Sequence, residues 1–127
     1  MINSSLPLIN VEPHGSFKSI IFSKLRFSAN EKFIEIKNNK VSELEHNLNF
    51  LDYGQGGLLD ILFKDNFVYI SYSENRGNWK SSTSIAKAKF DKVKLDFKNI
   101  FQAEPPIDSG YHFGSRLVIK DNYLFAS

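Results

Sequence analysis

An eight-residue pattern occurs twice in this chain and constrains its fold more than any other feature. Residues 64–71 read KDNFVYIS and residues 120–127 read KDNYLFAS, so the two copies, 56 residues apart, match in residue class at every position. In each copy apolar residues flank a Lys-Asp-Asn turn on both sides, which is typical of a β-hairpin. Recurrence at this spacing is a signature of solenoids and propeller blades. The repeat therefore predicts an all-β chain of similar antiparallel units.

Two more strands are expected between the hairpins. Residues 82–90 (STSIAKAKF) and 94–101 (KLDFKNIF) alternate small or apolar side chains with polar ones. With the hairpin around Lys64 they make residues 57–101 a four-stranded antiparallel sheet, which is one propeller blade. Residues 57–63 are apolar nearly throughout, so we expect them to form the innermost strand, buried on both faces.

The chain divides into four expected segments. Residues 1–31 show no clear pattern, and 32–52 read as a hairpin of a preceding blade, with strands at 32–37 and 40–44. Residues 53–107 read as the complete blade and 108–127 as the truncated start of the next. About two blades cannot close a ring, because propellers typically have 4–8. We therefore expect a fragment of a longer protein, an incomplete gene model, or a chain that pairs with something else.

Composition excludes several classes of function. The chain has no cysteine, which rules out disulfides and thiolate chemistry, and its net charge of +2 comes with scattered lysines rather than the basic stripe of a nucleic-acid-binding protein. No apolar run approaches the roughly 18 residues of a membrane span, and no signal peptide is visible in residues 1–10. His14 and His46 lack ligand spacing, so no metal site is predicted.

Two glycine-containing stretches carry a resemblance to a known family. Residues 53–61 read YGQGGLLDI, and residues 109–118 read SGYHFGSRLV. Both resemble signature stretches of the PQQ-dependent soluble aldose sugar dehydrogenases, the glucose/sorbosone dehydrogenase family. The segments VYISYS, STSIAKAKF, IFQAEPP and YLFAS also recur in the order of that family. The resemblance is clear over residues 53–127 and loose over 32–52.

The resemblance implies a partial six-bladed β-propeller and an enzyme of known chemistry. That family oxidises the C1 hydroxyl of aldoses with PQQ and bound calcium, passes the electrons to an external acceptor, and works in the periplasm or outside the cell. Most ligands for PQQ and calcium lie in later blades of the family, outside this chain. We therefore expect the 127 residues alone to be inactive.

The resemblance also assigns roles to four residues. His112 stands at the position of the general base, and Gln55 at a position that contacts the substrate. Tyr111 is expected to bind the sugar, where some relatives carry a polar residue, which leaves the sugar preference open. Arg116 is expected to bind the cofactor through its carboxylates; structural pairing with Asp108 or a backbone carbonyl is the alternative.

The repeat offers an independent argument for a shared site. At an offset of 56 residues Gln55 aligns with Tyr111, and the next position aligns with His112, so each candidate precedes the innermost strand of its unit. Loops that enter inner strands emerge near the axis, so Gln55 and His112 should meet at one mouth of the central channel. Histidine side chains ordinarily titrate near pH ~6.5, which suits a general base, and a glutamine amide can both donate to and accept from sugar hydroxyls.

Asp60, within an apolar strand, must be paired if it is buried, and we interpret it as structural.

Two other functions stay open at this point. A non-catalytic propeller module that binds a protein or a glycan would show the same blades without the cofactor-binding residues of later blades. An unrelated six-bladed hydrolase such as a lactonase would need a carboxylate-rich calcium cluster on the channel, and the sequence shows none.

Overall fold

Every regular element that the computed structural model describes is a β-strand. The structure describes residues 8–10, 19–22, 33–37, 40–114 and 116–127, and side-chain burial for 43–114 and 116–127. The predicted all-β fold class is therefore confirmed for these residues. The strands are β1 (Leu8–Asn10), β2 (Ser19–Phe22), β3 (Phe33–Lys37), β4 (Lys40–His46), β5 (Leu58–Lys64), β6 (Phe67–Asn75), β7 (Ser81–Lys89), β8 (Lys94–Leu95), β9 (Lys98–Gln102), β10 (Leu117–Lys120) and β11 (Tyr123–Ala126).

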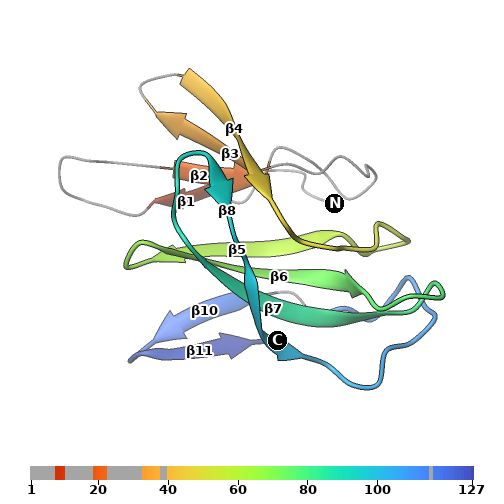
Figure 1. Ribbon diagram of the computed structural model, residues 1–127. Coiled ribbons are helices and arrows are strands. Elements are labelled where there is room, and N and C mark those ends of the chain that lie inside the picture. The colour runs from red at the N-terminus through yellow and green to blue at the C-terminus, as the bar shows by residue number, and fades with distance from the viewer. Residues whose placement is uncertain (1–7, 11–18, 23–32, 38–39, 115) are drawn as a thin grey trace.

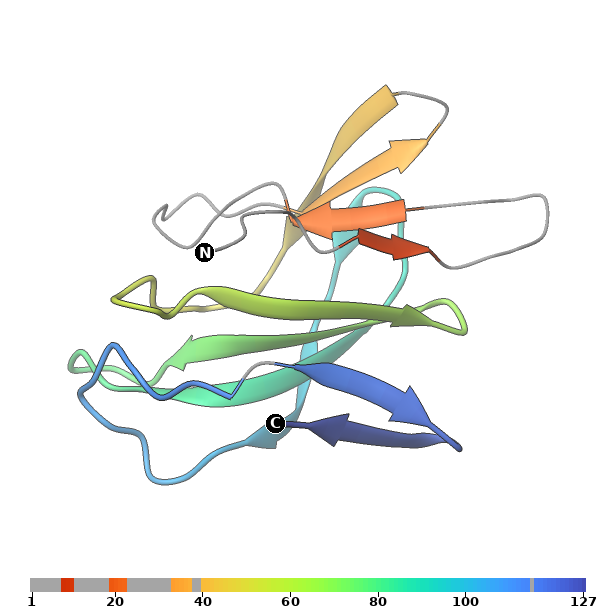
Figure 2. The ribbon, with the colours of Figure 1, turned by 180° about the vertical axis from the view of Figure 1, so that it is seen from behind.

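These strands form three sheets that lie one beside the next (Figure 1). The first sheet has the order β1-β2-β3-β4-β8, the central sheet β5-β6-β7-β9, and the C-terminal hairpin β10-β11. Neighbouring strands are antiparallel except β4 and β8, which are parallel. Strand β5 contacts β1 and β2 of the first sheet and β10 of the hairpin, so it lies between the other two sheets in both views (Figure 2).

The two hairpins of the repeat have the same register. In both, the Lys before the turn pairs with the aromatic residue after it, and the pairing continues without a shift through the next three positions. The Asp and Asn of the turn have φ of 52° and 66° in the first hairpin and 50° and 66° in the second. Positive φ at both central residues is the type I′ geometry, which Asn and Asp tolerate and which matches the twist of the strands. The predicted hairpins are confirmed.

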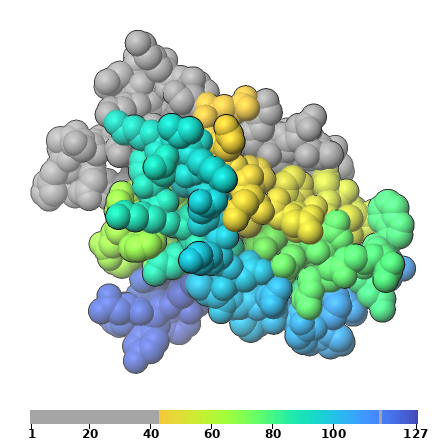
Figure 3. Space-filling model, in the orientation of Figure 1, coloured from red at the N-terminus to blue at the C-terminus, as the bar shows by residue number. Residues whose placement is uncertain are grey.

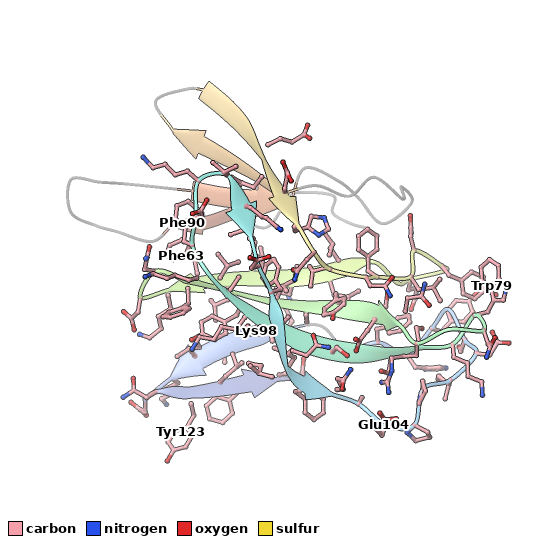
Figure 4. The ribbon with its side chains drawn as sticks, viewed as in Figure 1. Phe63, Trp79, Phe90, Lys98, Glu104 and Tyr123 are labelled. Atoms are coloured by element: carbon pink, nitrogen blue, oxygen red, sulfur yellow. The ribbon has the colours of Figure 1, made fainter. Side chains whose placement is uncertain are left out.

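The core lies between the first and central sheets. Val68 and Ile70 of β6 are fully buried there, and Leu44 of β4 and Leu95 of β8 cover them from the first sheet. The rings of Phe63 and Phe90 pack 5.4 Å apart at the end of the core near the first hairpin turn (Figure 4). Burial of side chains of this size stabilises the fold by about 1.5–3 kcal/mol each.

The predicted single strand at residues 94–101 is wrong. Residues 94–95 form β8 and pair with β4, whereas residues 98–102 form β9 and pair with β7. The side chain of Asn47 causes the break, because its Oδ1 accepts a hydrogen bond from Phe97 N at 2.8 Å and its Nδ2 donates to Phe97 O at 3.2 Å. Phe97 is thereby buried in the core and removed from the ladder with β7.

The other expected strands are present with small changes at their ends. The strands predicted at 32–37 and 40–44 correspond to β3 and β4, and the one predicted at 82–90 corresponds to β7. Sequence patterns missed β1 and β2, which lie within residues 1–31. Among the described residues no helix has the length and hydropathy of a membrane crossing.

Candidate functional site

Three loops gather at one end of the molecule and form the candidate site. They are the segment before β5, the β6–β7 turn and the long segment between β9 and β10 (Figure 1). The two Lys-Asp-Asn turns lie at the opposite end of the same strands in both views (Figure 2). We call the loop-bearing end the rim and define it by residues 51–57, 76–80, 103–114 and 116. It contains all four residues that sequence analysis selected.

The segments carrying Gln55 and His112 meet through their backbones. Gln55 N donates a hydrogen bond to Gly110 O at 2.7 Å. The approach requires glycine at position 54, because a Cβ there, at φ +63°, would lie 2.4 Å from Gly110 O. A Cβ on Gly110 would be a tight contact, 3.0 Å from Gly54 Cα. The predicted convergence of Gln55 and His112 on one rim is thus present in the structure.

Ser73 of β6 anchors the Gln55 loop to the central sheet. Its buried hydroxyl accepts a hydrogen bond from Gly57 N at 2.6 Å and donates to Leu51 O at 2.8 Å. Two backbone bonds accompany it, from Leu51 N to Ser73 O and from Ser73 N to Gly57 O, both at 2.9 Å. The loop is held at both of its ends, so the exposed Gln55 side chain projects from a fixed backbone.

His112 lies exposed on the rim in an uncommon backbone conformation. Its φ is +70°, the left-handed region, in which histidine is enriched relative to most non-glycine residues. Tyr111 precedes it, with the two ring centroids 6.5 Å apart, and Ser109 caps the turn because its hydroxyl accepts a hydrogen bond from Tyr111 N at 3.2 Å. A non-glycine residue held in this region costs about 1 kcal/mol or more and is typical of functional sites.

Asp60 joins the central sheet to the C-terminal hairpin. The carboxylate is buried, and its Oδ1 accepts a hydrogen bond from Ile61 N at 2.9 Å while Oδ2 accepts one from Leu117 N at 2.8 Å. Arg116 Nη1 lies 4.0 Å from Asp60 Oδ1, with 82% of the arginine side chain exposed. The buried aspartate is paired, as sequence analysis required, and the partner of Arg116 is Asp60 rather than Asp108.

The segment between β9 and β10 is tied down along its length. Ser81 and Ile107 exchange two backbone hydrogen bonds, at 2.9 and 3.0 Å, and Ala103 N donates to a carbonyl of β7 at 2.9 Å. Arg76 donates through Nη1 to Ser82 Oγ at 2.9 Å and through Nη2 to Glu104 Oε1. The hydrogen bond to Glu104 raises the pKa of the Arg76 guanidinium above its usual value. These contacts fix the path of the chain toward His112.

A polar network braces strand β9, which leads into this segment. Glu74 accepts hydrogen bonds from Ser84 at 2.6 Å, Gln102 at 2.7 Å and Asn99 at 3.0 Å. Burial acts to raise the pKa of the Glu74 carboxyl, but these hydrogen bonds outweigh burial and the pKa lies below its usual value. Tyr72 donates to Asn99 Oδ1 at 2.7 Å, and burial, together with the nearby Glu74 charge, raises its pKa to about 12.

Sequence analysis missed one glycine of the rim, whereas the position of Trp79 at a loop tip was expected from the sequence. Gly110 was not singled out, although it lies directly before the predicted Tyr111-His112 pair, and the contact with Gly54 shows why glycine stands there. Trp79, at the tip of the β6–β7 turn, contacts Tyr53 edge to face with ring centroids 6.2 Å apart. In the part of the chain that the structure describes, no three His, Asp or Glu side chains lie close enough to hold a metal ion.

Comparison with known proteins decides the family. The family described as Glucose / Sorbosone dehydrogenase matches residues 26–127. The chain belongs to this family. The aldose sugar dehydrogenase YliI of Escherichia coli (strain K12) is 37% identical to this chain in an alignment of 82 residues; the match covers 58% of this chain and 22% of YliI.

Solved structures of family members have the same fold. The soluble aldose sugar dehydrogenase of Escherichia coli in its apo form superposes with a TM-score of 0.69 at 28% identity, over 90% of this chain and 34% of that one. A glucose dehydrogenase superposes with a TM-score of 0.69 at 27% identity, over 76% of this chain and 31% of that one. This family member therefore spans about a third or less of the length of the relatives it matches, and its fold is the propeller-like arrangement of sheets that the repeat predicts.

Proposed function

We propose that this chain supplies the proton-abstracting and sugar-contacting part of a PQQ-dependent aldose dehydrogenase. The hydrogen bond from Gln55 N to Gly110 O carries the proposal, because it brings the two loops with the expected reactive side chains to one rim. Family membership supports an oxidoreductase acting on sugars. Both the fixed loop backbones and the exposed side chains are what a binding site on a rigid scaffold requires.

The proposed reaction is a two-electron oxidation at C1 of the sugar. The imidazole of His112 takes the proton of the C1 hydroxyl, and the hydrogen on C1 leaves with its electron pair as hydride, so that C1 becomes a lactone carbonyl. Proton transfer to a positioned side chain contributes about 10²–10⁴-fold to such a rate. When bound, PQQ would supply the acceptor for the hydride.

Gln55 and Tyr111 are proposed to hold the sugar for this step. The backbone N–H of Gln55 is used by Gly110, whereas its side chain is exposed and can both donate to and accept from hydroxyl groups. Tyr111 presents an exposed ring and hydroxyl next to His112. The pair would orient C1 toward the imidazole, and orientation of this kind lowers the barrier by pre-arranging the reacting groups.

Arg116 could bind an anionic cofactor, because its side chain is positively charged and exposed. The described residues lack the group of oxygen ligands that calcium requires. The guanidinium is exposed, and its contact with Asp60 is long at 4.0 Å, so N–H groups of the fork can donate to a carboxylate. We propose that Arg116 would hold one carboxylate of PQQ. Calcium takes six to eight oxygen ligands, and the described residues bring no acidic cluster together, so no role on this part of the chain is derived for it.

We further propose that the sheets are blades of one propeller. In this division residues 32–52 are a hairpin of a preceding blade, 53–107 form a complete blade and 108–127 begin the next. The shared register of the two hairpins supports it. The resemblance that suggests PQQ also suggests a periplasmic or secreted protein with an external electron acceptor.

Variants of His112 test the proposal in the protein that carries this sequence. With PQQ, calcium and glucose supplied, we expect His112→Asn to lower kcat for dye reduction by about 10²–10⁴-fold and to leave PQQ bound. Asparagine tolerates the left-handed backbone at this position but cannot take the proton. Gln55→Ala should raise KM by about 2- to 12-fold, the value of one neutral hydrogen bond. Tyr123→Phe, at the opposite end, is the control.

Retained turnover in His112→Asn would remove His112 from the mechanism. A titration of the 127-residue chain with PQQ tests the assignment of the cofactor site separately. Because Arg116 is the sole cofactor contact proposed here, we expect binding weaker than micromolar. Micromolar affinity or better would show that this chain holds most of the PQQ site.

A further inference from the structure

Four lysines from three strands lie together on one face of the central sheet. The register places Lys64 of β5 opposite Phe67 of β6, and Phe67 opposite Lys89 of β7. In the neighbouring row, Lys87 of β7 lies opposite Lys98 of β9. Opposed residues point to the same face of a sheet, as do residues two apart in one strand. We call this set the lysine face and define it as Lys64, Lys87, Lys89 and Lys98.

The lysine face is turned away from the core. Ala86 and Ala88, which alternate with the lysines of β7, are buried in the core on the other side of the sheet. Lys89 is exposed, and so are all five residues of β9, the edge strand that carries Lys98. Strand β9 lies on the side of the molecule seen in Figure 3, and Figure 4 marks Lys98 on the same side. These lysines are therefore accessible to a ligand.

No carboxylate neutralises three of the four lysines. Among the described residues, the amines of Lys87, Lys89 and Lys98 form no ion pair, and Lys64 has a contact of 3.9 Å with the exposed Asp65. Lys87 and Lys98 are also directly opposed in the ladder, and like charges in this position destabilise a sheet. The free chain thus contains a repulsion that a bound anion would relieve.

The rings beneath Lys87 indicate what kind of anion the face can take. Lys87 Nζ lies 4.2 Å from the ring centroid of Phe67 and 5.6 Å from that of Tyr69. Because the amine covers both rings, a ligand meets ammonium groups there rather than an aromatic surface. This argues against single-stranded nucleic acid, whose bases stack on aromatic side chains. All four cations are lysines, which act as compact point charges toward single carboxylates, whereas arginine is the residue suited to phosphate.

We infer that the lysine face binds an extended acidic segment of a partner protein. Its two rows lie two residues apart along β7, or about 6.5 Å. An extended segment with acidic residues at alternate positions projects its carboxylates to one side at the same spacing, so successive carboxylates would meet successive rows. The inference is independent of the proposed function. Lys64 belongs to the first Lys-Asp-Asn turn, at the end opposite the rim, so a bound segment leaves the rim open.

A titration of the 127-residue chain with two synthetic peptides tests the inference. One peptide alternates glutamate with serine over eight residues, and the other has glutamine in place of glutamate. Binding would be followed by the NMR shifts of backbone amides. We expect the acidic peptide to shift the amides of Lys87, Lys89 and Lys98. It should bind at least about fourfold more tightly than the neutral peptide, because each of four exposed ion pairs is worth about 1.4- to 5-fold. Added sodium chloride should weaken the binding, because salt screens exposed charges.

Single variants identify the face. Lys89→Gln and Lys98→Gln should each weaken binding of the acidic peptide by about 1.4- to 5-fold. Lys80→Gln removes an equal charge from the exposed β6–β7 turn on the rim and should leave the affinity unchanged. Lys98→Glu places a carboxylate opposite Lys87, so it should raise the melting temperature of the chain and weaken binding more than Lys98→Gln does. A lysine with a purely structural role would not change stability and binding in opposite directions.

Equal affinities of the acidic and neutral peptides would overturn the inference. Equal losses in Lys80→Gln and Lys98→Gln would overturn it too, because they would show attraction by net charge rather than by this face. Tighter binding of phosphatidylglycerol vesicles, or of an oligothymidylate with four phosphates, than of the acidic peptide would overturn the assignment to a protein segment. None of these outcomes bears on His112 or Gln55, which the turnover of sugar tests separately.

Discussion

Replacement of Asp60 by alanine should loosen the junction between the central sheet and the C-terminal hairpin. The Asp60 carboxylate is the acceptor for Leu117 N at 2.8 Å, across 57 residues of sequence, and for Ile61 N at 2.9 Å. In the alanine variant the buried N–H groups of Ile61 and Leu117 would both lose their hydrogen-bond acceptor. His112 lies shortly before Leu117 in the chain, so the junction also determines where the histidine sits.

The size of the effect follows from the desolvation of one buried N–H. A buried donor left unsatisfied costs about 1–3 kcal/mol, which corresponds to an increase of about 5- to 150-fold in the opening of the Leu117 hydrogen bond. The contact of Asp60 with Arg116 adds little, because the arginine is 82% exposed and the atoms are 4.0 Å apart. Arg116→Ala should therefore change the same exchange rate by less than about threefold.

Native-state hydrogen exchange of individual amides measures this directly. In Asp60→Ala the Leu117 amide should exchange faster by the stated factor, whereas the Val68 amide in the centre of the sheet should respond only to global stability. Asp60→Asn keeps one carbonyl oxygen and should give an intermediate rate. Unchanged protection of Leu117 in a folded Asp60→Ala chain would show that Asp60 does not hold the hairpin.

Two further predictions concern stability. Folding raises the pKa of Tyr72 from 10 to about 12, so Tyr72 contributes to the free energy of unfolding in full below pH 10, and this contribution is lost as the pH rises toward about 12. The free energy of unfolding in urea should therefore depend less on alkaline pH in Tyr72→Phe than in the unsubstituted chain. The same dependence on alkaline pH in both chains would refute this. Gly54→Ala should lower the free energy of unfolding by about 2–4 kcal/mol, because alanine disfavours the positive φ and its Cβ would clash with the Gly110 backbone. Gly77→Ala should lower it by only about 1–2 kcal/mol, because Gly77 has φ +84° but lies in open space. Equal losses would mean that the Gly54 contact is not tight.

Local signals in the sequence predicted the hairpins, because the chemistry that forms them is local. An Asp-Asn pair tolerates the left-handed backbone that a two-residue turn requires, and the flanking apolar residues supply the strands. The repeat then placed Gln55 and Tyr111 at equivalent positions before β5 and β10, so a shared rim followed from topology alone. The close approach of the two loops bears this out.

Contacts between distant residues could not be predicted in the same way. The break within residues 94–101 depends on Asn47, which binds the backbone of Phe97 from 50 positions away. Alternation of apolar and polar residues persists through Phe97, so the pattern gives no sign that the strand leaves one sheet for another. The pairing of Asp60 with Leu117 N is similar: burial required a partner, but only the packing of two sheets identified it.

Among the described residues, several contacts set Gln55 relative to His112. The Gln55–Gly110 hydrogen bond fixes one loop on the other, the Asp60–Leu117 bond fixes the strand beyond His112, and the two bonds between Ser81 and Ile107 fix the segment before it. The rim can therefore be intact in a chain that turns over no sugar for want of cofactor contacts. Sugar binding at the rim and turnover with PQQ are accordingly separate tests, and only the first measures what these residues build.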